Sequence, residues 1–275
     1  DESLKEEILI NVTPSEVRAA VLENGVLQEV YVERAARRAL ISNIYKGRAM
    51  RVLPGMQAAF IDIGLERTAF LHASDIARRG MAENGVEIPS IRELVREGDE
   101  IMVQVVKDPL GNKGARLTTY ITLPSRHLVL LPHGDSVGIS ARIEDEDERE
   151  RLRSLVAGLL AENELDCGAI VRTVAEGAES EALAADLRYL IKLWRVVQER
   201  CSGRSVKSLV HEDLSLPLRV LRDMVTRDVE RVLVDSRSDF EAMREFADTY
   251  LQDVGPNIEP VVQNLHPEMG GADFI

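Results

Sequence analysis

"AAFIDIGLERTAFLHASDI", residues 58–76, consists of two short apolar segments on either side of a turn at Gly64. Each segment carries one phenylalanine, Phe60 and Phe70, in a chain that is only 4% aromatic. Side chains alternate between the two faces of a strand, so Phe60 is expected to share a face with Ala58 and Asp62. The two rings either fill a core or lie on a surface that receives a flat ligand. Composition alone favours the core.

Short β segments separated by glycine-containing turns continue on both sides of this stretch. Before it, turns are predicted at Lys46-Gly47 and Pro54-Gly55, and the pattern resumes at residue 100 with "EIMVQVVKDPLGNKGARLTTYITL". Short strands at regular spacing predict a small β-barrel of the OB type. The polar residues 77–99 between them are predicted to form a loop with one helical turn, which Pro89-Ser90 can start.

The flanking regions have different patterns. At the N-terminus Asn24-Gly25 separates apolar runs, which is a strong hairpin signal because both central residues of a type I′ turn need positive φ. A three-stranded meander is therefore predicted at residues 8–12, 17–22 and 26–32. Strands and helices alternate after Pro124, which indicates an α/β layer and makes the chain α+β as a whole. The predicted helices are 144–162, 180–200, 217–227 and 239–251, and the predicted strands are 169–173, 205–210 and 229–236.

Composition limits the classes of function. A chain of 275 residues with 45% hydrophobic and 29% charged residues is typical of a globular protein with one large domain or two to three small ones. It contains no apolar run long enough to span a membrane and no signal peptide, so a cytoplasmic protein is expected. With 47 acidic and 34 basic residues, indiscriminate nucleic-acid binding is disfavoured, and any such site must be local.

Basic residues gather near the two phenylalanines. On an OB-type barrel, exposed aromatic rings stack on unpaired bases, and each ring contributes about 1 to 3 kcal/mol. Nearby cations would supply a local track for the phosphates of such a strand. The candidates before Phe60 and on the last predicted hairpin of the barrel are Lys46, Arg48, Arg51, Lys107, Lys113 and Arg116.

Common catalytic and metal motifs are absent from the sequence. There is no P-loop, GxGxxG, HExxH or GxSxG motif, and the five histidines lack metal-ligand spacing. Cys167 and Cys201 have no CxxC spacing and are expected to be free thiols. A small-molecule enzyme that uses carboxylates such as Asp62 or Asp235 is an alternative that no spacing supports, and Asp62 itself is interpreted as structural.

Several long runs resemble the amino-terminal part of the bacterial ribonuclease E/G family, and its ribonuclease G branch more than its ribonuclease E branch. They are "NIYKGRAMRVLPGMQAAFIDIGLERTAFLHASDI", "VKDPLGNKGARLTTYITLPSRHLVLLP", "VGISARIEDEDERERL" and "AIVRTVAEG", and the resemblance extends over residues 6–251. It implies an RNA-binding OB barrel at 38–122, a 5′-monophosphate sensor region at 123–204, and a discontinuous ribonuclease H-like layer at 1–37 and 205–254. Residues 255–275 are left unassigned.

The resemblance also implies roles for individual residues. Phe60, Phe70 and Lys113 match RNA-contacting positions, and Lys46 is added from its place beside them. Arg172 and Thr173 match the pair that binds the 5′-phosphate. A guanidinium can donate two charge-assisted hydrogen bonds to phosphate and a hydroxyl can add a third. Further contacts are expected from Ser125, Val129 and Arg142; Ser125 replaces a glycine of ribonuclease E, and Ala141 replaces an arginine.

The family's acidic metal motif and its zinc-binding CPxCxG segment do not occur in this sequence. The resemblance implies that the full-length protein is an endoribonuclease that cleaves single-stranded RNA in rRNA maturation and mRNA decay. Its Mg²⁺ would be held by a catalytic domain outside this chain, Zn²⁺ would belong to the full-length protein, and this chain alone is expected to be inactive. A homodimer is implied for the full-length protein and a weaker association for this chain. The alternative is a non-catalytic RNA-binding or regulatory protein on the same scaffold.

Overall fold

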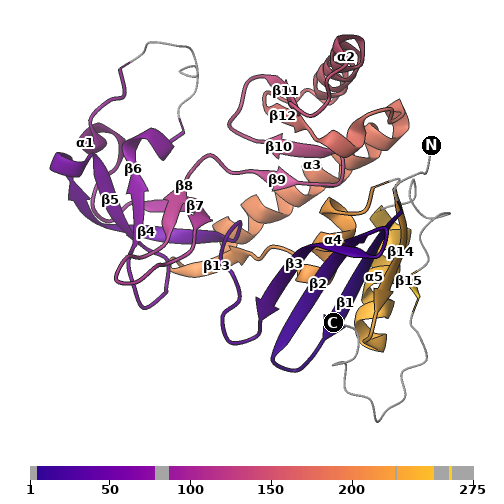
Figure 1. The fold of residues 1–275 in the computed structure, drawn as a ribbon. Coiled ribbons are helices and arrows are strands. Elements are labelled where there is room, and N and C mark those ends of the chain that lie inside the picture. Colours follow the sequence, from indigo (N-terminus) through magenta and orange to yellow (C-terminus); the bar gives the residue numbers. More distant parts are fainter. Residues whose placement is uncertain (1–4, 78–86, 227, 251–259, 262–275) are drawn as a thin grey trace. The chain divides into compact units, whose positions relative to one another are not determined.

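The computed structural model describes residues 5–77, 87–226 and 228–250, together with the backbone of 260–261. The chain forms two compact units (Figure 1). The first combines Asp1–Ala39 with Leu214–Ile275, and the second is the continuous stretch Leu40–Asp213. The predicted α+β composition is confirmed, since sheets and helices occur in both units.

The first unit contains a five-stranded sheet with the order β15-β14-β1-β2-β3. Strand β1 is central, where it pairs in parallel with β14 and antiparallel with β2. Alternate residues of β1, Ile8 and Ile10, are fully buried against α4 and α5, the helices that the structure describes in this unit. The elements are β1 Glu6–Val12, β2 Glu16–Glu23, β3 Val26–Arg34, α4 Leu216–Asp223, β14 Val229–Val234, α5 Arg237–Tyr250 and β15 Pro260–Val261.

The predicted meander at the N-terminus is confirmed. Strand β2 pairs antiparallel with β1 and with β3. Asn24 and Gly25 adopt φ of 48° and 79°, the positive values that a tight hairpin turn requires. The helix predicted at 217–227, the strand at 229–236 and the helix at 239–251 correspond to α4, β14 and α5.

The second unit contains a closed five-stranded β-barrel, which confirms the predicted barrel. Its strands follow the order β4-β5-β6-β8-β7, and a β4–β7 pairing closes the circle. A sixth strand, β13, adds to the edge of β4. The elements are β4 Ile44–Leu53, η1 Pro54–Met56, β5 Ala58–Asp62, β6 Ala69–His72, η2 Ala73–Asp75, α1 Ile91–Leu94, β7 Glu100–Lys107, β8 Arg116–Thr118 and β13 Ser208–His211.

One sequence prediction for this region differs from the structure. The turn predicted at Lys46-Gly47 is wrong, because β4 runs through both residues. Gly47 is required for packing instead: a Cβ there would lie 2.5 Å from Ile61 Cγ2. Strand β13 pairs with the barrel strand β4, and the second compact unit extends to Asp213.

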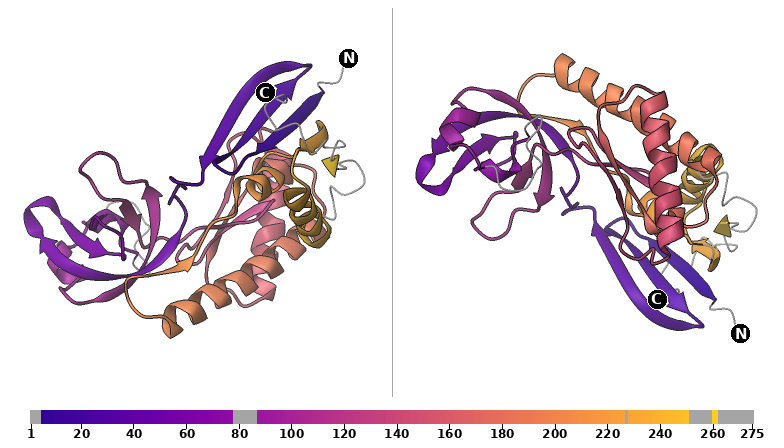
Figure 2. Two further views of the ribbon diagram at one scale, coloured as in Figure 1. Left: turned by 90° about the horizontal axis from the view of Figure 1, so that it is seen from below. Right: turned by 90° about the horizontal axis from the view of Figure 1, so that it is seen from above.

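A four-stranded sheet with the order β11-β12-β10-β9 completes the second unit. Leu128, Leu130, Ala169 and Val171 point to one face, where they form a single core with the apolar sides of α2 and α3. Figure 2 shows α3 running alongside the sheet, and the chain after it leads into β13. The elements are β9 Leu123–Pro124, β10 Leu128–Leu131, β11 Val137–Ile139, α2 Glu146–Glu162, β12 Gly168–Val171, η3 Thr173–Ala175 and α3 Ser180–Gly203.

Candidate functional site

Phe60 and Phe70 lie directly opposite each other on the neighbouring strands β5 and β6. Their ring centroids are 6.4 Å apart and the ring planes are inclined by 67°. The residues on either side of them in sequence, Ala59, Ile61 and Leu71 among them, are fully buried in the barrel core. Both phenylalanines are half-buried and do not belong to that core. The core packing that composition favours is therefore wrong for both rings, which lie on the outside of the barrel.

The two lysines predicted to contact RNA have different surroundings. Lys113 is exposed in the loop between β7 and β8, where its backbone forms a paired bridge with Leu110. Lys46 lies on β4, and its ammonium is 3.6 Å from the Glu100 carboxylate and donates to the Arg204 carbonyl at 3.0 Å. Lys113 is thus open to solvent, whereas the charge of Lys46 is already matched within the protein.

The carboxylate of Asp62 stabilises a turn. Its Oδ1 accepts a hydrogen bond from the Gly64 N–H at 2.9 Å, and its Oδ2 is 3.0 Å from Lys207 Nζ. The Gly64 N–H and then Lys207 lower the pKa of Asp62, so it stays ionised. A carboxylate whose two oxygens are both paired within the protein suits a structural role.

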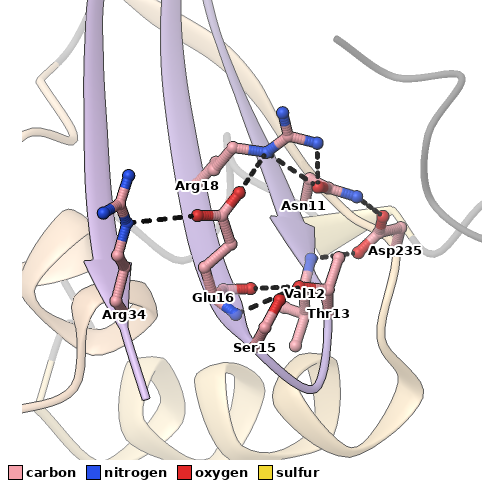
Figure 3. Close-up of polar contacts among 8 residues, drawn as sticks. All are labelled: Asn11, Val12, Thr13, Ser15, Glu16, Arg18, Arg34 and Asp235. Atoms are coloured by element: carbon pink, nitrogen blue, oxygen red, sulfur yellow. Dashed lines mark hydrogen bonds and ion pairs between the residues drawn. The ribbon is translucent and has the colours of Figure 1, made fainter. Parts of the chain in front are cut away.

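Asp235, the other carboxylate considered as catalytic, is nearly buried in the first unit. Figure 3 shows the chain of polar contacts that holds it. Its Oδ2 accepts from Asn11 Nδ2 at 2.5 Å and its Oδ1 accepts from the Val12 N–H at 2.6 Å. Arg18 in turn donates to Asn11 Oδ1 at 2.7 Å. Each oxygen of Asp235 therefore joins the end of β14 to the end of β1.

Arg172 and Thr173 follow directly after β12, where the chain leaves the four-stranded sheet. The Arg172 guanidinium donates to the Ser125 carbonyl at 2.7 Å, and the Arg172 N–H donates to the His127 carbonyl at 2.8 Å. The hydroxyls of Thr173 and Ser140 are 2.7 Å apart. Both Arg172 and Thr173 are half-buried, so a guanidinium and two hydroxyls gather at one partly exposed sheet end.

The hydroxyl of Ser125 points into the protein rather than toward this group. Its Oγ lies 2.7 Å from Asp186 Oδ2, the shorter of its two acceptor contacts, and 3.1 Å from the Leu128 carbonyl oxygen, and the Ser125 side chain is buried. Asp186 Oδ2 also accepts the His127 N–H at 2.7 Å. Ser125 reaches Arg172 through its backbone carbonyl, while its side chain fixes the turn between β9 and β10.

The remaining predicted contacts lie around the same sheet. Val129 on β10 pairs with Ile170 on β12, and the exposed Ile170 shows that this pair is on the face away from α2 and α3. Arg142 is exposed, and its N–H donates to the Ser140 hydroxyl at 3.3 Å. Arg149 on α2 donates to the carbonyls of Ser140 and Ile143 and thereby orders the loop that carries Arg142.

Metal-ligating side chains do not converge within the described part of the chain, where no group of three His, Cys, Asp or Glu residues could hold an ion. Across the same residues, every helix is too short or too polar to pass through a bilayer.

Two sequence profiles match the chain. The profile described as "Ribonuclease E/G family" matches residues 122–268, and the one described as "S1 RNA binding domain" matches residues 41–119, which span the barrel. The chain is 50% identical over 258 residues to Ribonuclease G of Escherichia coli K12, covering 92% of this chain and 52% of that protein. The chain belongs to the ribonuclease E/G family.

The chain is more similar to ribonuclease G than to ribonuclease E in the other comparisons as well. Ribonuclease G of Haemophilus influenzae is 49% identical over 257 residues, whereas Ribonuclease E of Escherichia coli K12 is 36% identical over 242 residues and is covered to 22% of its length. The prediction that the chain resembles ribonuclease G more than ribonuclease E is confirmed. The chain spans about half the length of the Ribonuclease G relatives.

Sequence reasoning missed three residues that shape the site: Asp186, Ser140 and Arg149. Asp186 had a detectable signal, because it occupies a buried position between Leu183 and Leu187 on the apolar side of α3. An acid at a core position of a helix needs buried donors. The roles of Ser140 and Arg149 depend on how the loop before α2 folds back onto that helix. The local sequence pattern does not predict this.

Proposed function

We propose that this chain is the RNA-capturing and 5′-monophosphate-sensing part of an endoribonuclease that acts on single-stranded RNA. One observation carries the proposal: Phe60 and Phe70 form a pair on the outside of a barrel that matches an RNA-binding domain. Rings on the second and third strands of an OB-type barrel stand where such barrels bind oligonucleotides. Stacking on aromatic rings tolerates any base, which suits a nuclease with many substrates.

Replacing the rings tests this RNA-binding role. Phe60→Leu and Phe70→Leu keep the apolar character but remove the stacking surface, so each is expected to weaken binding of a single-stranded RNA by about 1 to 3 kcal/mol. The matched control is Tyr31→Leu, an aromatic residue 37% exposed on β3 of the other unit. Fluorescence anisotropy with a labelled oligonucleotide measures the affinities. Wild-type affinity in both phenylalanine variants would refute RNA capture by this face.

For the 5′-phosphate, the proposed ligands are Arg172 and Thr173, with Ser140 and Arg142 beside them. The Ser125 carbonyl accepts one hydrogen bond from the Arg172 guanidinium and orients it at the sheet end. A guanidinium binds phosphate oxygens through charge-assisted hydrogen bonds, and a hydroxyl adds one more. A 5′-monophosphate offers acceptor oxygens for these groups, while a 5′-hydroxyl carries no anion. Val129 and Ile170 would supply apolar surface on the same side of the sheet.

Two oligonucleotides that differ only at the 5′ end test this sensor role. The wild type is expected to bind the 5′-monophosphate form more tightly than the 5′-hydroxyl form, and Arg172→Ala is expected to remove the preference. Arg195→Ala, an exposed arginine on α3, is the control and should keep it. Equal preference in the wild type and Arg172→Ala would refute the sensor while leaving RNA capture intact.

Phosphodiester hydrolysis is proposed for the longer protein, with Mg²⁺ stabilising the developing charge when it is bound there. No cluster of acids in the described residues fits such an ion, so the role proposed for this chain is capture. A cleavage assay with this chain, with Mg²⁺ and then with EDTA, tests whether this chain captures RNA without cleaving it. Cleavage that EDTA abolishes would place a metal site in this chain. A non-catalytic RNA-binding protein is the second candidate, and only a cleavage assay on the longer protein separates the two.

The discontinuous first unit is proposed to be the family's ribonuclease H-like layer. Its support is the central β1, which has an antiparallel β2 on one side and a parallel β14 on the other. Homodimer formation and a zinc site in the longer protein remain predictions.

A further inference from the structure

One residue from each strand of the barrel contributes to a single lateral row. Arg51 on β4 pairs with Phe60 on β5, Phe60 pairs with Phe70 on β6, and Phe70 pairs with Arg116 on β8. Arg116 in turn pairs with Lys107 on β7. We call these five residues the barrel row. Adjacent strands are about 4.8 Å apart, so the two phenylalanines have an arginine one strand away on each side.

The members of the barrel row point outward together. Residues paired across neighbouring strands share a face of the sheet. Beside Phe60, Phe70 and Arg116 the next residues in sequence point inward: Ala59, Leu71 and Leu117 are fully buried in the barrel core. Arg51, Lys107 and Arg116 are exposed, and the two rings are half-buried. The row therefore presents two aromatic surfaces between cations.

Charge pairing divides the barrel's basic residues into two groups. Lys46 and Arg48 lie 3.6 Å and 3.5 Å from the two oxygens of Glu100, and Lys207 is paired with Asp62. Among the described residues no acid pairs with Arg51 or Lys107. Arg116 has one acidic neighbour, Asp75, whose Oδ2 is 3.3 Å from its Nη2. In a protein of net charge −13, Arg51 and Lys107 thus bring cations without an acidic partner to the row that contains the aromatic pair.

We propose that Arg51 and Arg116 are RNA-positioning residues that bind phosphates on either side of the bases stacked on Phe60 and Phe70. The RNA strand would then cross the barrel perpendicular to its strands, from β4 over β5 and β6 to β8. Asp75 competes with the RNA phosphate for Arg116 and so restrains binding on that side. This inference rests on the proposed RNA-binding function of the same face.

The salt dependence of RNA binding tests the phosphate contacts. For single strands, the slope of log K against log salt changes by about 0.7 for each phosphate contact. Arg51→Gln and Arg116→Gln are each expected to weaken binding of a 5′-hydroxyl oligonucleotide and to reduce the slope by about that amount. The 5′-hydroxyl end keeps the Arg172 site out of the measurement. Arg92→Gln, an exposed arginine on α1 outside the row, should behave as the wild type.

A double-mutant cycle tests the restraint by Asp75. Asp75→Asn frees Arg116 and should tighten RNA binding about two- to threefold at low salt, as expected for the loss of a weak, exposed ion pair. In the Arg116→Gln background the same substitution should have no such effect, because the two residues act through one contact. An equal gain in both backgrounds would show that Asp75 acts by general repulsion and would overturn the restraint.

The outcomes separate this inference from the proposed function. If Arg51→Gln and Arg116→Gln match Arg92→Gln in slope while Phe60→Leu and Phe70→Leu weaken binding, the positioning roles are refuted and RNA capture stands. If the phenylalanine variants also bind as the wild type does, both proposals fail. A reduced slope in the two arginine variants, with wild-type behaviour of Arg92→Gln, supports the positioning roles.

Discussion

Asp186 Oδ2 lies 2.7 Å from Ser125 Oγ, so a buried carboxylate on α3 fixes the turn between β9 and β10. The same oxygen accepts the His127 N–H at 2.7 Å. The carbonyl of Ser125 faces outward from this turn and binds the Arg172 guanidinium. The position of Arg172, the candidate phosphate-binding residue, thus depends on Asp186, which acts through Ser125.

Replacing Asp186 is expected to damage both stability and the sensor. Asp186→Ala removes the acceptor of the His127 N–H and leaves the Ser125 hydroxyl only the Leu128 carbonyl, so it should lower the free energy of unfolding by about 3 kcal/mol. Urea denaturation measures this. At a temperature where the variant is still folded, its preference for 5′-monophosphate RNA should also decrease. Glu199→Ala, an exposed acid on the same helix, should change neither quantity.

Glu148 is expected to contribute stability that depends on pH. It accepts two hydrogen bonds from Arg151 and one from the Gly177 N–H, each at 2.7 Å, and these partners lower its pKa to about 2. A carboxyl whose folded pKa is depressed stabilises the protein above its unfolded pKa and loses that contribution as pH falls through the folded value. Glu148→Gln should therefore lower the free energy of unfolding at pH 7 by about 1 kcal/mol. The difference from the wild type should shrink between pH 4.5 and about 2.

Glu150→Gln is the matched control for Glu148. Glu150 also pairs with an arginine three residues later, with Glu150 Oε2 2.7 Å from Arg153 Nη1, but its other hydrogen bond, from Ser154, also stays within α2. Its effect on stability should be smaller, because exposed pairs within a helix are screened by water. A larger pH-dependent loss for Glu150→Gln than for Glu148→Gln would contradict the assignment.

The elements were predictable where local pattern decides them. Positive φ at Asn24-Gly25 and the alternation around Phe60 are both local, and the meander and the barrel strands followed from them. Pairings between distant residues were not predictable. Arg116 meets Phe70 across 46 positions of sequence, and Asp186 meets Ser125 across 61. The sequence named six candidate cations near the rings, and only the strand register places Arg51 and Arg116 beside Phe60 and Phe70.

Two glycine-to-alanine substitutions are expected to have opposite effects on stability. At Gly47 a Cβ would lie 2.5 Å from Ile61 Cγ2 and 3.2 Å from Ile63 Cγ2, inside the barrel. Gly47→Ala should therefore lower the free energy of unfolding by about 1 to 3 kcal/mol. Gly158 lies within α2, and a Cβ there would meet no atom within 4 Å, so Gly158→Ala should raise it by about 0.5 to 1 kcal/mol. Urea denaturation of both variants shows whether each one raises or lowers the free energy of unfolding.

Asp235 is expected to contribute to stability through both of its oxygens. Arg18 occupies Asn11 Oδ1, so the Asn11 amide must present its NH₂ group to Asp235 Oδ2, while Asp235 Oδ1 accepts the Val12 N–H (Figure 3). Asp235→Ala removes both acceptors and should lower the free energy of unfolding by about 2 to 3 kcal/mol. Asp235→Asn keeps one acceptor but turns an NH₂ group toward a donor, so it should still be destabilised, by about 1 to 2 kcal/mol. Asp228→Ala, an exposed acid before the same strand, should be close to the wild type. Denaturation curves that show Asp235→Asn as stable as the wild type would mean that one of the two contacts contributes nothing.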